Sequence, residues 1–249
     1  MKRLRLCLLL LILLCLTACS QMEVTHMPDT VWTQNQRNIF AAYTGNPDRL
    51  DHGPLLERER AMLQLVADAD AYLTARYGAE FVFVDATSPL SGDPAFIVKG
   101  PGSPRTFTVR ITNENGKKNF ADGYYNLLKE GELNSYAQQL LTDAGLQAKT
   151  WLYLGGYSDS LSADKSLREE ISAGTYFSVA GTIYVCAPDS ADSLAAVDAA
   201  LQGHGLCGYV TIAFVSGMPE GAPADDWLLV HADKVLAQRG VSLKKPEVN

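Results

Sequence analysis

Residues 80–112, EFVFVDATSPLSGDPAFIVKGPGSPRTFTVRIT, decide the fold of the first half of the chain. Three short runs stand in this stretch: Glu80 to Asp85, Ala95 to Lys99, and Phe107 to Thr112. They are rich in β-branched and aromatic residues, and the third alternates apolar with polar residues, which is typical of a strand with one buried face. Segments containing Gly and Pro separate the runs and favour turns. The pattern therefore predicts a three-stranded antiparallel meander.

Helices are predicted on both sides of this meander. Before it, apolar residues recur every three or four positions from about residue 55 to 77, and Gly78 is a natural stop. After it, leucine and tyrosine recur with helical spacing from Phe120 to Leu141, with an interruption at Gly131. The first half is thus expected to be a helix packed on the meander, followed by a second helix.

The second half alternates between strand-like and helix-like segments. Strands are predicted at 149–154, 175–186 and 206–215, with Gly181 a bulge or break in the second. Helices are predicted between them, one capped by Ser162 or Asp164 and one capped by Ser190, and a last helix spans Pro223 to Gln238. Such alternation favours crossover connections and a mixed sheet. The fold class is therefore α+β, with one compact region over 55–240, divisible near residue 144, and a polar tail at 241–249.

The first 20 residues, MKRLRLCLLLLILLCLTACS, have the layout of a secretory signal peptide. Three cations, Lys2, Arg3 and Arg5, precede or interrupt the start of an apolar run that continues to Leu16. A membrane span needs about 20 apolar residues, so this run is too short for one. An export signal over residues 1–18 is predicted.

The end of the run, Leu16-Thr17-Ala18-Cys19, resembles the lipobox of bacterial lipoproteins. The resemblance implies cleavage before Cys19 and a diacylglyceryl thioether on its sulfur, with membrane lipid as a partner and acylation, palmitate for example, on the mature N-terminus. Two acyl chains are enough for stable anchoring, which would hold the protein on the outer side of the cell membrane. The alternative is an ordinary signal peptide with Cys19 an incidental thiol. Residues 19–54 are polar and predict a tether, with a short helix near Thr33 to Tyr43.

Two further segments resemble uncharacterised exported lipoproteins of Gram-positive bacteria. They are Arg76-Tyr77-Gly78-Ala79-Glu80-Phe81 at the end of the first helix and Asp122-Gly123-Tyr124-Tyr125 at the start of the next. No activity follows from this likeness.

The composition argues against nucleic acid as a partner. The net charge is −7, and removal of Lys2, Arg3 and Arg5 with the signal takes it to −10. Clustered cations, which nucleic-acid binding requires, are limited to two Lys-Lys pairs. Hydrophobic residues at 47% and charged residues at 20% are instead usual for a globular domain with its own core.

Cys186 and Cys207 are the two cysteines that remain for the folded region. They end one predicted strand and begin the next, so they meet in a disulfide only if these strands are antiparallel. If the strands are parallel, the two cysteines lie at opposite ends and stay free thiols. A metal site at His204 and Cys207 is a third option, but the pair supplies two of the four usual ligands. No metal or other cofactor is predicted.

Recognisable catalytic motifs are absent from the sequence: it contains no Gly-x-Ser-x-Gly, His-Glu-x-x-His, phosphate loop, EF-hand loop or Cys-x-x-Cys. The remaining candidates for catalysis are His204, Asp225 and His231. Asp225 and His231 stand on the last predicted helix near Trp227. The stronger interpretation there is structural, because an Asp at a helix start favours the macrodipole and Trp227 with Val235 covers the core.

Two hypotheses for function follow. The first is a membrane-anchored binding or interaction module at the cell envelope, with an unknown envelope protein or small ligand as partner. The second is a cell-envelope hydrolase whose active site has no sequence signature. A deep pocket with convergent carboxylates, or with His204 and Cys207, would favour the hydrolase.

Overall fold

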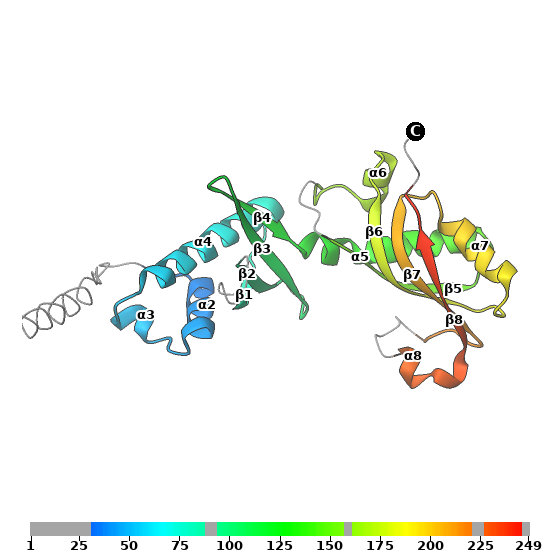
Figure 1. The fold of residues 1–249 in the computed structure, drawn as a ribbon, viewed down its shortest axis with the longest axis horizontal. Helices are drawn as coiled ribbons and strands as arrows, with labels where there is room; N and C mark the ends of the chain where they lie inside the picture. The colour runs from blue at the N-terminus through cyan, green and yellow to red at the C-terminus, as the bar shows by residue number, and fades with distance from the viewer. Residues whose placement is uncertain (1–30, 88–93, 157–160, 221–226, 246–249) are drawn as a thin grey trace, which may run out of the picture.

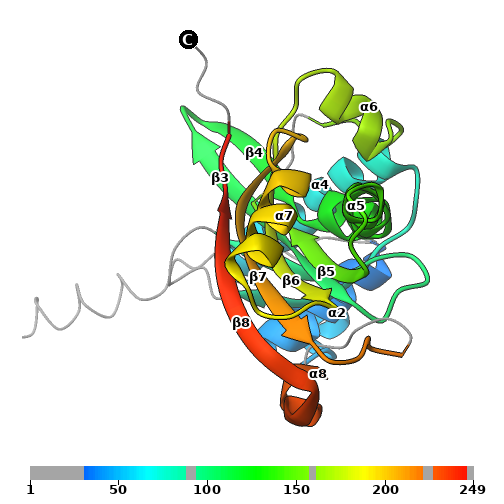
Figure 2. The ribbon, with the colours of Figure 1, turned by 90° about the vertical axis from the view of Figure 1, so that its right-hand side faces the viewer.

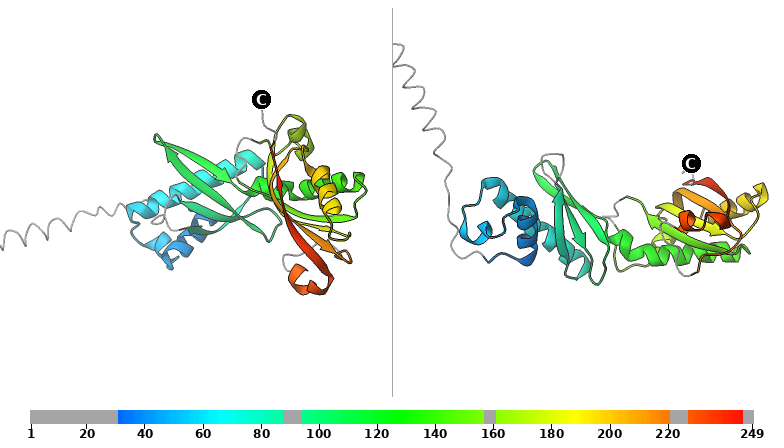
Figure 3. Two further views of the ribbon diagram at one scale, coloured as in Figure 1. Left: turned by 45° about the vertical axis from the view of Figure 1, so that its right-hand side comes forward. Right: turned by 90° about the horizontal axis from the view of Figure 1, so that it is seen from below.

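The computed structural model describes residues 31–87, 94–156, 161–220 and 227–245, and these form two α+β lobes joined by one long helix (Figure 1). Residues 33–122 make the N-terminal lobe and residues 124–245 the C-terminal lobe, each with its own four-stranded sheet and its own hydrophobic core. The connecting helix α5 (Tyr124–Asp143) leaves the N-terminal sheet and runs along one face of the C-terminal sheet (Figure 3). The predicted α+β class is confirmed.

The N-terminal lobe begins with helices α2 (Gln34–Thr44), α3 (Arg49–His52) and α4 (Glu57–Tyr77). A capping box starts α2, because the Thr33 hydroxyl accepts a hydrogen bond from the Gln36 backbone N–H and the Thr33 N–H donates to the Gln36 side chain. Ile39 and Phe40 are fully buried against α4 and the sheet. The short helix near Thr33 is therefore confirmed, but the tether predicted to reach residue 54 is wrong beyond residue 32. The reason is that a mostly polar sequence still supplies two large core side chains, at the adjacent positions Ile39 and Phe40.

The N-terminal sheet is an antiparallel meander of β1 (Val82–Thr87), β2 (Ala95–Lys99), β3 (Thr106–Glu114) and β4 (Lys117–Asp122). The first three are the strands predicted. The fourth was predicted to be loop and helix start, but Asn115 and Gly116 both adopt positive φ, at 53° and 78°, and turn the chain into a hairpin. Phe120 consequently lies in β4 and the following helix starts at Tyr124. That helix passes through Gly131 without interruption.

The C-terminal sheet has the order β5-β6-β7-β8 and is mixed, as predicted (Figure 2). Its strands are β5 (Ala148–Leu154), β6 (Phe177–Val185), β7 (Leu206–Val215) and β8 (Val235–Leu243). β6 and β7 are parallel, and both edge strands are antiparallel to their neighbours. Between β6 and β7 the chain crosses over through α7 (Ala191–Leu201), capped by Ser190 as expected. The short helix α6 (Leu167–Ser172) is capped by Ser166 rather than by Ser162 or Asp164.

Gly181 is neither a bulge nor a break, because the pairing of β6 with both neighbours runs through it without a register shift. Its φ of 131° and its contacts explain the glycine instead: a Cβ here would lie 2.2 Å from the carbonyl oxygen of Trp151 on β5. Close approach of the backbones is therefore what requires glycine at this position.

The predicted last helix, Pro223 to Gln238, is wrong over its described part. The chain forms a single turn, α8 (Trp227–Val230), then a 3-10 turn η2 (Ala232–Lys234), and then enters β8. Val241 and Leu243, assigned to a polar tail, are buried in the core. The edge of β7 supplies hydrogen-bonding partners for this segment, and that long-range pairing overrides the local helical pattern.

Candidate ligand-binding site

The sequence-predicted site residues do not converge. Asp225 and the lipidation residue Cys19 lie outside the described residues. The backbone carbonyl of His204, just before β7, accepts a hydrogen bond from the Tyr136 hydroxyl at 3.1 Å. His231 stands beyond the other end of β7, where its ring stacks on Trp227 with centroids 4.7 Å apart. The structure therefore does not assemble a catalytic group from His204 and His231.

Cys186 and Cys207 are both free thiols. Cys207 lies beside Ser178 near the start of β6, whereas Cys186 follows the end of that strand. Eight residues of extended chain between these positions span about 26 Å, far beyond disulfide reach. The Cys207 thiol donates instead to the Phe177 carbonyl at 3.4 Å. Within the described residues no group of three or more His, Cys, Asp or Glu side chains is placed to hold a metal ion, so the pairing of His204 with Cys207 gains no further ligand.

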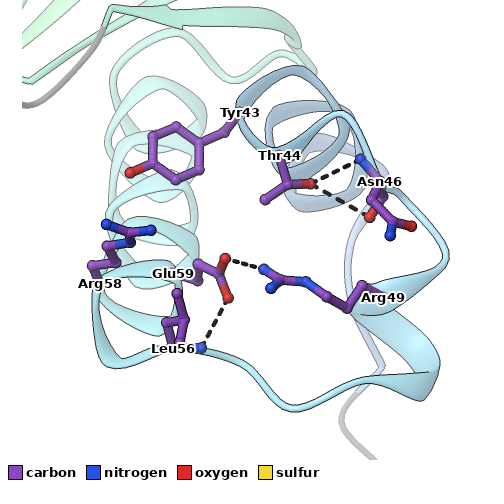
Figure 4. Close-up of a pocket in the computed structure, with 7 residues that line it drawn as sticks. All are labelled: Tyr43, Thr44, Asn46, Arg49, Leu56, Arg58 and Glu59. Atoms are coloured by element: carbon purple, nitrogen blue, oxygen red, sulfur yellow. Dashed lines mark hydrogen bonds and ion pairs between the residues drawn. The ribbon is translucent and has the colours of Figure 1, made fainter.

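A concave site lies instead on the N-terminal lobe, where the end of α2, the helix α3 and the start of α4 meet (Figure 4). We call it the head pocket; its volume is about 530 Å³. Its lining residues are Tyr43, Thr44, Asn46, Arg49, Leu56, Arg58 and Glu59.

An ion pair between Arg49 and Glu59 forms the floor of the head pocket. Figure 4 shows Arg49 reaching from α3 to one oxygen of Glu59 on α4, while the other oxygen accepts the Leu56 backbone N–H at 2.8 Å. The Glu59 side chain is only 3% exposed, so its charge depends on these two donors. The guanidinium of Arg49 also lies over the ring of Phe40, 5.6 Å from its centroid. Both oxygens of the carboxylate are therefore engaged by the protein itself.

Arg58 is the second cation of the head pocket, and it is differently placed. It is exposed, it has no hydrogen-bond or ion-pair partner within the described chain, and in Figure 4 it lies with Tyr43 on the side of Glu59 away from Arg49. Since Arg49 and Glu59 neutralise each other, Arg58 gives the pocket a net positive charge. A chain of net charge −7 thus presents a cation with unused donors to solvent.

An apolar groove continues from the head pocket and shares Tyr43 and Arg58 with it. It has a volume of about 340 Å³ and lies between α4 and the facing ends of β1 and β2. Besides the two shared residues it is lined by Ala61, Met62, Leu65, Ala86, Thr87, Pro94, Ala95 and Phe96. Head pocket and groove together make one site with a polar, cationic end and a hydrophobic end, which is the usual design of a small-ligand site.

Sequence reasoning missed this site because half of its polar end lies in the segment interpreted as a tether. Two signals in the sequence mark that segment as folded: Thr33 three residues before Gln36, which makes a capping box, and the apolar pair Ile39 and Phe40 within the helix that it starts. The meeting of α3 with α4 has no local signature. It depends on the Arg49–Glu59 pair, which joins residues 10 apart.

A second polar cluster surrounds Asp122, between the two lobes. Its buried carboxylate accepts hydrogen bonds from the Tyr72 and Tyr77 hydroxyls, both at 2.8 Å, and lies 3.4 Å from an Arg76 nitrogen. Arg76 also donates to the Leu161 carbonyl of the C-terminal lobe at 3.2 Å. Burial and the Asp122 charge raise the pKa of both tyrosines well above the usual value. Because the carboxylate is fully enclosed by its partners, we assign this cluster to structure rather than to ligand binding.

Comparison of the chain with protein-family models, with curated proteins and with solved structures found no match. The fold and the site are therefore interpreted from their own geometry. Among the described residues, no helix combines the length and the apolar character that a membrane crossing requires.

Proposed function

We propose that the chain is a membrane-anchored extracytoplasmic lipoprotein, tethered through Cys19, that works as a binding module with the head pocket and apolar groove as its ligand site. The observation that carries the binding role is the cation with unused donors, Arg58, at the junction of a polar pocket and an apolar groove. The lipobox resemblance of residues 16–19 supports the anchor and the location on the outer side of the cell membrane.

The site favours binding over the alternative of an envelope hydrolase. Hydrolysis by carboxylates needs an acid and a base that are free to exchange protons with the substrate. The head pocket has one lining carboxylate in the described chain, Glu59, and both its oxygens are engaged by Arg49 and Leu56. The arrangement is suited to holding a charged group, not to transferring a proton.

The anchor is tested by the intact mass of the membrane-extracted protein beside a Cys19→Ala variant. We expect a mature mass that begins at Cys19 and carries a diacylglyceryl group. The variant lacks the cysteine at which the lipobox is cut, so it should keep residues 1–18 and carry no lipid. Thiol counting on the unfolded mature wild-type protein should find Cys186 and Cys207 free. An unlipidated wild-type mass, with the variant released and processed like wild type, would contradict the anchor.

The ligand site is tested by native mass spectrometry of the mature chain, residues 20–249, produced without the signal and the lipidated cysteine and purified without detergent. We expect a co-purifying small molecule, lost when Ala61→Trp fills the groove. Ala199→Trp on the exposed face of α7 is the matched control and should retain the ligand. A wild-type protein that carries nothing, or a ligand that persists in Ala61→Trp, contradicts the assignment of this site.

A further inference from the structure

We propose that the ligand is an anionic phospholipid of the membrane, with its phosphate at Arg58 and one acyl chain in the apolar groove. This inference rests on the proposed function and adds the chemical class of the ligand. Two features of the described residues and one of the sequence lead to it: the charge at the polar end, the lining of the groove, and the short distance along the chain to the predicted anchor.

The positive charge of Arg58 at the polar end of the site favours an anionic ligand. Glu59 is neutralised by Arg49, so the net charge that a ligand meets is that of Arg58. The Arg58 guanidinium offers a planar set of donors that matches phosphate oxygens, and none of these donors is used within the described chain. Tyr43, which lines both parts of the site, stands beside it.

The mostly apolar lining of the groove favours a hydrocarbon chain over a second polar group of the ligand. Among the described residues that line it, all side chains are apolar except Arg58, Thr87 and the Tyr43 hydroxyl, and the groove runs from Arg58 toward Phe96 between α4 and the sheet. A ligand that satisfies Arg58 and fills the groove must therefore carry its negative charge at one end of an apolar tail. Each methylene that enters such a groove should tighten binding about fourfold.

The position of the site along the chain indicates the membrane as the source. Residues 19–32 separate the predicted lipid anchor from Thr33, and 14 residues span at most about 50 Å when fully extended. The 11 residues of α2 (Gln34–Thr44) then carry the chain about 16 Å further, to the pocket. A site held this close to a bilayer meets phospholipid headgroups at high local concentration.

The test uses the mature chain without its anchor, residues 20–249, and lysophosphatidylglycerol, a single-chain anionic phospholipid, below its micelle concentration. Calorimetry should show affinity rising about fourfold per methylene across decanoyl, lauroyl and myristoyl chains. The monoacylglycerol of equal chain length should bind at least tenfold more weakly, and glycerol 3-phosphate should show no binding. Affinity that does not depend on chain length, or equal affinity for the neutral lipid, overturns the proposal.

Two variants separate the two ends of the site. Arg58→Gln should lower the affinity for lysophosphatidylglycerol to that of the monoacylglycerol and leave the monoacylglycerol affinity unchanged. Ala61→Trp should abolish binding of both lipids. Lys117→Gln removes an exposed cation at the β3–β4 turn of the same lobe and should change neither affinity. All variants should keep the wild-type urea midpoint, since Arg58 has no partner to lose in the described structure and Ala61 is exposed.

Failure of this inference is distinguishable from failure of the proposed function. If native mass spectrometry finds a ligand that Ala61→Trp displaces, but that ligand is not a phospholipid and lysophosphatidylglycerol does not bind, the binding module stands and the lipid assignment is wrong. If Arg58→Gln leaves lysophosphatidylglycerol affinity unaltered, the phosphate position is wrong even where the lipid binds.

Discussion

At the scale of single residues, Asp122 is the buried charge on which the polar cluster between α4 and the start of α5 depends. It receives two tyrosine hydroxyls and the Tyr124 backbone N–H, and it faces Arg76, so four donors from α4 and α5 converge on one buried carboxylate. A buried charge of this kind is tolerated because each of its oxygens is hydrogen-bonded. When the carboxylate is removed, these buried donors lose their acceptor, which destabilises the folded state.

Replacement of Asp122 by Ala should lower the free energy of unfolding by about 2–6 kcal/mol, because the part-buried hydroxyls of Tyr72 and Tyr77 lose their acceptor, at about 1–3 kcal/mol each. Urea unfolding measures the change. Asp68→Ala is the control, since Asp68 pairs with Lys118 on the surface and its removal should cost about 1 kcal/mol or less. Equal effects of the two substitutions would show that the Asp122 cluster is not a structural centre.

At the scale of elements, α2 changes the interpretation of the whole N-terminal region. Its polar composition predicted a tether. In the structure, however, the Asn35 side-chain amide donates to the Phe81 carbonyl at 2.9 Å and its oxygen accepts a hydrogen bond from the Phe83 N–H at 3.1 Å. The helix thereby pairs with the edge of β1, which otherwise would expose its unpaired backbone groups. A segment that covers a sheet edge and fills the core belongs to the fold.

Removal of α2 should therefore unfold the N-terminal lobe. A chain in which residues 19–54 are deleted, as a pure tether would allow, should show loss of near-ultraviolet circular dichroism and of a cooperative transition for that lobe. Phe40→Ala offers the milder test, with an expected cost of about 3–5 kcal/mol from the cavity that it leaves. The control Ala42→Ser, at an exposed position on the same helix, should change the urea midpoint very little. Normal folding of the deleted chain would show that this segment is a tether and not part of the fold.

At the scale of the whole molecule, the stability of the protein should depend on alkaline pH. The pKa values of Tyr72 and Tyr77 are raised by burial and then by the neighbouring Asp122 charge. A raised folded-state pKa means that the stabilisation is complete below the unfolded value, about 10, and is lost as the pH rises above it. Each tyrosine then contributes a slope of about 1.4 kcal/mol per pH unit.

Between pH 10 and 12, the free energy of unfolding should therefore fall by up to about 2.7 kcal/mol per pH unit from this pair. The double variant Tyr72→Phe, Tyr77→Phe should lose that slope, although it is less stable at pH 7 because Asp122 loses two donors. Chemical denaturation at a series of pH values gives the result. Tyr209→Phe, which changes an exposed ring, should keep the wild-type slope. A double variant as sensitive to alkali as the wild type would refute the assignment.

Local sequence determined a large part of this protein. The first three strands, the periodic helix that ends at Gly78, and the alternation of strands and helices beyond residue 144 follow from short-range patterns, and each appears in the structure near its predicted place. The export signal and the lipid site at Cys19 are equally local, and they stay predictions that mass measurement will test.

Tertiary structure decided what depends on partners distant in sequence. The parallel pairing of β6 with β7 separates Cys186 from Cys207, and the free edge of β7 makes a strand of a segment whose local pattern is helical. The candidate ligand site could likewise not be predicted from local sequence, because it arises where α2, α3 and α4 meet the ends of two strands. The physical reason is common to all three: hydrogen bonds and burial gained over long sequence separations outweigh local preferences of a few tenths of a kcal/mol per residue.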